Sequence, residues 1–197
     1  MRKGDEQIGL PAAVYNDTAA NIEALTGVAE GAVAYATDTD ELGTYDGAAW
    51  VWGSGGGYTE GAKVYNNANQ SIPNESITAL TFNSEYYDTD GIHDNAVNNS
   101  RLTCQTAGKY VIIGNFQFAS NSTGYRAAWI VLGGATYIAE FFNTAINGNV
   151  TTMVIATIYD LEVGNYVGLM CYQGSGGAFN VMYNAEVSVN FMMQRIG

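Results

Sequence analysis

The feature that most constrains the fold of this chain is the alternation of side chains in residues 108–119. Two faces result, one carrying Tyr110, Ile112, Phe116 and Phe118 and the other carrying Val111, Ile113, Asn115 and Gln117. A period of two is typical of a strand with one face on a core. Similar short runs, interrupted by Gly, Asn, Asp and Ser, recur from residue 62 to residue 197. The pattern predicts an all-β antiparallel sandwich or jelly roll.

Ten segments of this region are expected to form strands. They are residues 63–66, 77–82, 85–87, 100–105, 109–119, 126–132, 136–143, 150–161, 165–173 and 181–195. Several are apolar on both faces, whereas a two-layer sandwich would leave one face of each strand polar. We therefore expect another subunit to cover the second face. The residues expected at this subunit interface are Val154, Tyr166, Met170, Val189 and Phe191.

A run of glycine and serine at residues 53–57 predicts a flexible linker between two domains. Residues 1–15 are expected to form an extended arm, and Asn16-Asp17-Thr18 to cap a short helix from Ala19 to about Gly27. Residues 32–52 have the alternation and turn signals of a three-stranded β-meander. We therefore expect a small N-terminal module in residues 1–52 and a larger head in residues 58–197.

The charge of the chain excludes some partners. With 19 acidic and 7 basic residues, the net charge is −12, which argues against binding to nucleic acid or to an anionic membrane. No apolar run reaches the roughly 18 residues of a membrane span. No apolar region of a signal peptide follows the first residues, so we expect synthesis in a cytoplasm. Cys104 and Cys171 are then expected to be buried free thiols, although a disulfide between neighbouring strands stays open.

An acidic turn is the constellation with the clearest ligand character. Asp88, Asp90 and Asp94 lie within seven residues, and closely spaced carboxylates can hold Ca²⁺. The alternative is a solvated turn that uses Asp and Gly for its backbone geometry. His93 is the single histidine of the chain, and no Cys-x-x-Cys pair is present. These residues favour a protein that is not an enzyme, with a converging pair of carboxylates left open.

Aromatic residues beside Asn- and Gly-rich loops suggest a site for sugars. Tyr125, Tyr172 and Phe179 are expected near loop tips, where exposed rings can stack on sugar rings. The alternative is ordinary turn chemistry with packed aromatic side chains. Arg101 and Arg126 are scarce positive charges, and we expect both in ion pairs within or between subunits rather than in a ligand site.

Residues 58–197 resemble the globular heads of the complement 1q and tumour-necrosis-factor superfamily. The similarity is carried by residues 106–118, which are similar to that superfamily's Gly-x-Tyr-x-Phe strand, and by residues 189–197, which are similar to its closing strand. The resemblance implies a ten-stranded jelly roll that assembles as a homotrimer.

Residues 32–50 resemble a small β module of tailed-phage tail-fibre and virion surface proteins. The heads found behind that module often carry patterns like Val64-Tyr-Asn, Ser71-Ile-Pro and Tyr87-Asp-Thr-Asp-Gly. The resemblance implies a virion surface protein attached through its N-terminal module to other phage virion proteins. The residues expected to serve attachment are Leu10, Pro11, Tyr15, Trp50 and Trp52.

Three roles follow as expectations. The first is a non-enzymatic tail fibre or receptor-binding knob that adheres to a host surface glycan or receptor. The second is a capsid decoration (cement) or head-fibre protein. The third, of another class, is a freestanding carbohydrate-binding module.

Overall fold

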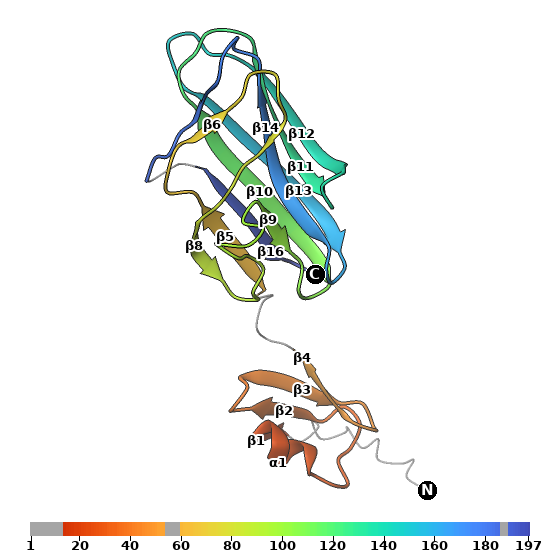
Figure 1. Ribbon diagram of the computed structural model, residues 1–197. Coiled ribbons are helices and arrows are strands. Elements are labelled where there is room, and N and C mark those ends of the chain that lie inside the picture. The colour runs from red at the N-terminus through yellow and green to blue at the C-terminus, as the bar shows by residue number, and fades with distance from the viewer. Residues whose placement is uncertain (1–13, 54–59, 186–188) are drawn as a thin grey trace, which may run out of the picture. The chain divides into compact units, whose positions relative to one another are not determined.

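The computed structural model describes residues 14–53, 60–185 and 189–197 (Figure 1). The chain divides into two compact units, Met1–Gly57 and Tyr58–Gly197. Leu10, Pro11 and most of the expected linker lie outside the described residues. Among the described residues, no helix is long and apolar enough to cross a bilayer.

The N-terminal unit is a four-stranded sheet with one short helix. Its elements are β1 (Val14–Asp17), α1 (Ala19–Glu23), β2 (Val33–Ala36), β3 (Glu41–Tyr45) and β4 (Trp50–Gly53), and the strand order is β1-β2-β3-β4. Thr18 caps α1 by accepting a hydrogen bond from the backbone N–H of Asn21. The expected meander is confirmed, but residues 14 and 15 do not belong to an arm, because β1 pairs in parallel with β2.

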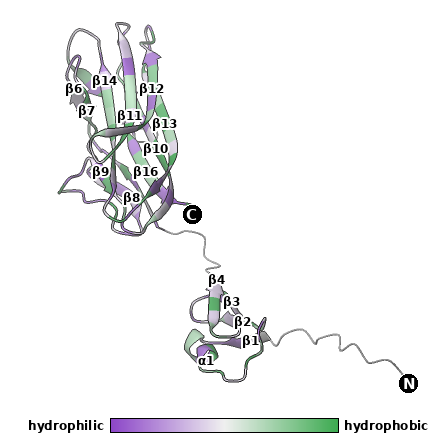
Figure 2. Ribbon diagram, turned by 90° about the vertical axis from the view of Figure 1, so that its right-hand side faces the viewer, coloured by the Kyte–Doolittle hydropathy of each residue, from purple (hydrophilic) through white to green (hydrophobic). Residues whose placement is uncertain are grey.

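The head is a sandwich of two antiparallel sheets (Figures 1 and 2). Its strands are β5 (Gly61–Tyr65), β6 (Gln70–Ile72), β7 (Thr78–Ala79), β8 (Ser84–Asp88), β9 (Arg101–Thr103), β10 (Gly108–Phe118), β11 (Tyr125–Leu132), β12 (Thr136–Thr144), β13 (Thr151–Leu161), β14 (Tyr166–Gln173), β15 (Phe179–Val181) and β16 (Asn190–Arg195). The seven-stranded sheet runs β6-β15-β10-β16-β5-β8, with β13 on β10. The five-stranded sheet runs β12-β11-β14-β7, with β9 also paired to β14. The jelly-roll prediction is confirmed.

The core lies between the two sheets and is lined by alternate residues of β10. Tyr110, Ile112, Phe116 and Phe118 are all fully buried, as their period predicts. The fifth inward position of this strand is Gly114, and a Cβ there would lie 2.6 Å from a methyl carbon of Leu169. Glycine is therefore needed at this position, because the opposite sheet packs directly against the backbone of β10.

The last expected strand is wrong as a single element. β15 pairs with β6 and with Phe118, whereas β16 pairs with β5 and with the first half of β10. Val181 and Phe191 nevertheless face the same core, so the apolar alternation continues across the break and hides it. The expected strand at residues 77–82 shrinks to β7, and β6 was not expected.

Both cysteines are free and fully buried, in agreement with the expectation of two buried thiols. Burial raises the pKa of each thiol, which keeps it protonated and unreactive.

Candidate ligand-binding face

The outward side of the five-stranded sheet is apolar along its centre. Successive residues of a strand point to opposite sides, so Ala127, Trp129 and Val131 of β11 face away from the core. They are buried there by their own neighbours, Met170 and Tyr172 of β14. This small second core forms the floor of an exposed aromatic surface on the outward side of the five-stranded sheet.

Five aromatic side chains lie on or around this floor, and we call them the aromatic face: Tyr125, Trp129, Tyr137, Phe142 and Tyr172. Tyr125 stacks on Tyr172 with 5.0 Å between ring centroids and lies 6.4 Å from Phe142. Trp129 lies 5.7 Å from Phe142 and 5.8 Å from Tyr137. The series therefore crosses β14, β11 and β12, which lie side by side in Figure 2.

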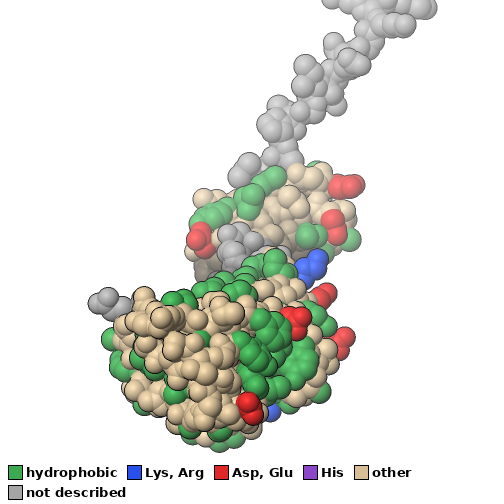
Figure 3. Space-filling model, turned by 90° about the horizontal axis from the view of Figure 1, so that it is seen from above, with side chains coloured by type: hydrophobic (Ala, Val, Ile, Leu, Met, Phe, Trp, Pro, Cys, Tyr) green, Lys and Arg blue, Asp and Glu red, His purple; other side chains and the backbone are tan. Residues whose placement is uncertain are grey.

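The rings remain open to solvent. The exposed fractions are 44% for Tyr125, 54% for Tyr137 and 53% for Phe142. In the view down onto the head, hydrophobic side chains form a broad area with single acidic side chains beside it (Figure 3). An exposed group of large aromatic side chains on a rigid sheet is typical of a binding surface.

The polar end of the aromatic face is uncharged near neutral pH. A hydrogen bond with the Tyr125 side chain raises the pKa of Tyr172 to about 12. The Tyr172 phenol therefore keeps its proton and can exchange neutral hydrogen bonds with a ligand whose ring stacks alongside.

Phe179 does not join the two tyrosines with which it was grouped. Its ring stacks on Phe118 at 5.3 Å and lies 4.5 Å from the guanidinium carbon of Arg126. Arg126 follows Tyr125 in β11, so the two side chains point to opposite sides of the sheet. Phe179 packs against the main core, and only Tyr125 and Tyr172 stay together.

The sequence reasoning missed Trp129, Tyr137 and Phe142. Trp129 stands between Ala127 and Val131 in a strand that is apolar on both faces, and this pattern was the available signal. The pairing of β12 with β11, which brings Phe142 opposite Ala127, depends on a hairpin and a bulge that periodicity does not fix.

Ion pairs of Arg126 and Arg101 within one subunit, one of the two expected arrangements, are absent from the described part of the chain. Arg126 is fully buried and donates to the backbone carbonyls of Asn121, Thr123 and Tyr125. Arg101 lies over the ring of Tyr166, with 4.6 Å from its guanidinium carbon to the centroid.

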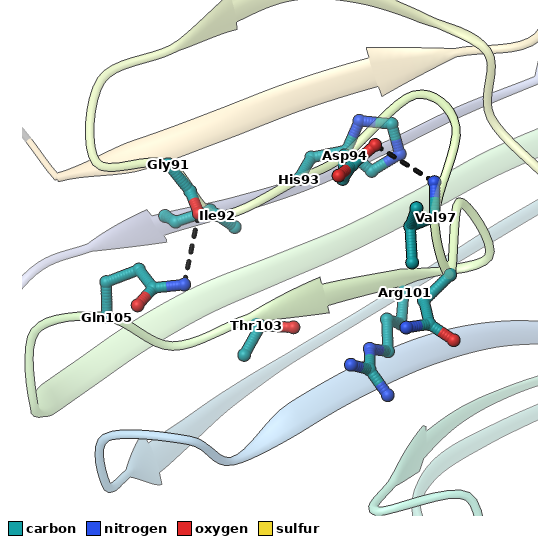
Figure 4. A pocket seen from close by; sticks show the side chains of 9 residues that line it. Gly91, Ile92, His93, Asp94, Val97, Arg101, Thr103 and Gln105 are labelled. Carbon is teal, nitrogen blue, oxygen red and sulfur yellow. Dashed lines mark hydrogen bonds between the residues drawn. The ribbon is translucent and has the colours of Figure 1, made fainter.

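The structure does not assemble Asp88, Asp90 and Asp94 into a metal site. The Asp88 carboxylate accepts hydrogen bonds from the backbone N–H groups of Asp90, Ile92 and His93. The Asp94 carboxylate accepts hydrogen bonds from the backbone N–H groups of Ala96 and Val97, and Figure 4 draws the bond from Val97. Among the described residues, no group of three or more His, Cys, Asp or Glu is placed to hold a metal ion. The carboxylates shape the turn, which was the alternative interpretation.

The five residues expected at a subunit interface fall in three places. Val189 and Phe191 are buried in the main core, so their assignment to an interface is wrong. Tyr166 and Met170 are half-buried on the five-stranded sheet, where Met170 packs beside the aromatic face. Val154 alone lies on the outward side of the seven-stranded sheet, and it is 55% exposed.

Around Val154 the seven-stranded sheet presents a second apolar surface, which we call the β10–β13 face. It consists of Val111, Ile113, Val154, Ile158 and Met192. The register brings these side chains together, because Val111 is opposite Ile158, and Ile113 is opposite Met192. Ile158 is 62% exposed, so this face has no partner within the described chain.

In the N-terminal unit, the aromatic residues expected to serve attachment pack together. Trp50 lies 5.8 Å from Tyr15 and 5.8 Å from Trp52 between ring centroids, and it is largely buried. Trp52 donates its indole N–H to Glu23 at 2.9 Å. These residues hold the unit together, and Leu42 and Val51 are the most exposed of its large apolar residues in the described range.

Comparisons with known proteins bear on the fold. The sequence matches no protein-family model and no curated protein. Among solved structures, the chain is similar to murine APRIL at pH 5.0, with a TM-score of 0.53 and 6% identity over 68% of this chain and 97% of that chain. It is also similar to Eiger TNF from S. frugiperda, with a TM-score of 0.53 and 8% identity over 72% of this chain and 94% of that chain. At such identities the likeness shows the fold alone, and the head is a jelly roll of the tumour-necrosis-factor type.

Proposed function

We propose that this chain is a non-enzymatic surface protein of a bacteriophage virion, whose head trimerises and adheres to a glycan on the host surface. The aromatic face carries the proposal. Tyr125, Phe142 and Tyr137 offer exposed rings along one sheet, and the Tyr172 phenol supplies a neutral polar group beside them. Flat exposed rings beside a phenol group suit an extended ligand of alternating apolar and hydroxylated surfaces, which is the chemistry of an oligosaccharide.

The β10–β13 face supports self-association. Val154 and Ile158 are exposed on it, and burying a side chain of this kind contributes about 1.5–3 kcal/mol. Because this face and the aromatic face belong to different sheets, a trimer built on the first would leave the second open to a ligand. The resemblance of the head to trimeric jelly rolls and of residues 32–50 to a tail-fibre module supports the virion setting.

The glycan-binding part of the proposal is tested with purified full-length protein on a glycan microarray and on host cell envelopes. We expect saturable binding that weakens about tenfold or more in Tyr172→Ala and Tyr125→Ala, because truncating an anchoring aromatic costs at least about 1.4 kcal/mol. Tyr183→Ala is the matched control, since Tyr183 is similarly exposed but follows β15 of the other sheet.

Wild-type protein that binds neither glycans nor envelopes would contradict glycan adhesion. Binding that all three variants retain would contradict the assignment to the aromatic face. The first result would favour a capsid decoration role, in which the head needs no host ligand, whereas the second would move the glycan site to another part of the head.

A further inference from the structure

A hollow of about 230 Å³ opens on the same outward side of the five-stranded sheet as the aromatic face. The register explains why space is left there. Gly168 of β14 is paired with Val131 on one side and with Arg101 on the other, so no side chain stands between those two residues. A Cβ at Gly168 would lie 3.3 Å from the carbonyl oxygen of Ser100. The hollow therefore depends on glycine at this position.

Arg101 is the one charged residue among the described residues that line the hollow. Its guanidinium rests on the Tyr166 ring, which orients it by a cation–π contact. It makes no hydrogen bond or ion pair to a side chain within the described chain, in contrast to Arg195, which pairs with Glu60 at 3.3 Å. Asn98 and Tyr166 line the same hollow. The donors of this guanidinium thus remain available to a ligand.

A neighbouring hollow shares Asn98 and Arg101 but is less suited to an anion. It also contains Asp94, whose carboxylate is turned toward the backbone N–H of Val97 (Figure 4). In the same view, the guanidinium of Arg101 lies apart from the carboxylate of Asp94. Arg101 lines both hollows, and its guanidinium rests on the ring of Tyr166, which lines only the hollow that has no acidic residue in its described lining.

We propose that the hollow beside Arg101 binds the carboxylate of an acidic sugar, a uronic or sialic acid, within a glycan whose other rings lie on the aromatic face. This inference rests on the proposed glycan-binding function and specifies the ligand class. Val131 and Met170 form part of the hollow and part of the floor of the aromatic face, so the two surfaces are continuous.

The chemistry of the hollow favours a carboxylate. A planar guanidinium matches a carboxylate with two parallel hydrogen bonds. One guanidinium balances one negative charge, and the net charge of −12 on the chain opposes a more highly charged phosphate group. The hollow is smaller than the usual range of about 300–1,000 Å³ for a complete ligand site, which suits a single sugar ring.

The test compares matched acidic and neutral probes by calorimetry on the full-length protein: 3′-sialyllactose against lactose, and trigalacturonate against its trimethyl ester. We expect at least one acidic probe to bind tenfold or more tightly than its neutral partner. Arg101→Gln should remove this preference while leaving the affinity for the neutral partner unchanged. Lys63→Gln is the control, because Lys63 also lies over an aromatic ring, that of Tyr86, but on the other sheet.

Each further outcome decides the matter. Equal affinity for acidic and neutral probes, or a preference that survives in Arg101→Gln, would overturn the inference and leave glycan binding by the aromatic face intact. Galactose 6-phosphate binding as tightly as the acidic probes would show a general anion site and would also overturn it. Failure of every acidic and neutral probe, together with a negative microarray, would remove the proposed function as well.

Discussion

Asp94 shows how a single carboxylate can stabilise a turn without a metal ion. Its oxygen accepts the backbone N–H groups of Val97 and Ala96 at 2.9 and 2.8 Å, and these bonds lower the pKa of the carboxyl. A carboxyl whose pKa is lower in the folded state stabilises the fold above its unfolded pKa, and this contribution is lost as the pH falls through the folded pKa.

We therefore expect Asp94→Ala to lower the melting temperature at pH 7. The difference in melting temperature between the variant and the wild type should disappear as the pH falls below the ordinary aspartate pKa of 3.8. Thermal melts followed by circular dichroism from pH 7 to pH 2.5 check this. A gap that stays constant over the whole range would show that the charge of Asp94 is irrelevant to the turn. Added EDTA should leave the wild-type curve unchanged at pH 7, because no group of three or more His, Cys, Asp or Glu among the described residues is placed to hold a metal ion.

β16 is an element whose two faces have different roles. Phe191 points inward and stacks on Phe82 with 5.7 Å between ring centroids, whereas Met192 points outward on the β10–β13 face. Phe191→Ala is expected to lower the free energy of unfolding by about 3–5 kcal/mol, because it removes a buried ring and leaves a cavity.

Met192→Ala serves as the matched control one residue along the strand. With both changes made in the Val154→Asp background, in which we expect a monomer, its effect should be much smaller. Urea unfolding of both variants, followed by fluorescence, measures the difference. Equal losses for the two variants would mean that the faces of β16 are assigned the wrong way round.

A strand could be predicted where the local alternation of residues sets its bounds, and could not where pairing with a distant segment sets them. β10 was predicted almost to its ends because its inward residues keep a strict period of two over the whole strand. The interruption between β15 and β16 was not predicted. Val181, Val189 and Phe191 all face one core, so the alternation carries no sign of a break. β1 was missed because its partner β2 is parallel and is reached through α1, a pairing that the pattern of residues 14–17 does not indicate.

For the candidate site, the sequence placed Tyr125 and Tyr172 near one another but not their neighbours. Trp129 and Phe142 come together through the pairing of β11 with β12, and the hollow beside Arg101 arises because Gly168 separates β9 from β11. These are consequences of register between distant segments. Residue spacing along one strand does not determine them.

For the whole molecule, we propose that the seven-stranded sheet mediates self-association and that the five-stranded sheet binds the ligand. Val154→Asp places a charge on the exposed β10–β13 face, so we expect a folded monomer, because the change leaves the core untouched but an unpaired carboxylate would be buried in a subunit interface. Light scattering should give three times the mass of one chain for the wild type and one chain mass for the variant.

Thr152→Asp is the control, since Thr152 is exposed near the start of the same strand, β13. Its hydroxyl accepts a hydrogen bond from the side-chain amide of Gln117. A wild-type monomer, or a Val154→Asp trimer with unchanged melting temperature, would contradict the assignment of the β10–β13 face.

The most direct test of the central claim, the proposed virion role, is electron microscopy of the proposed parent phage particle, labelled with an antibody against the head. The account predicts label at the tip of the tail, where a receptor-binding head must meet the host. Label spread over the capsid would contradict the adhesive role and identify a decoration protein, and particles that carry no label would contradict the virion assignment itself.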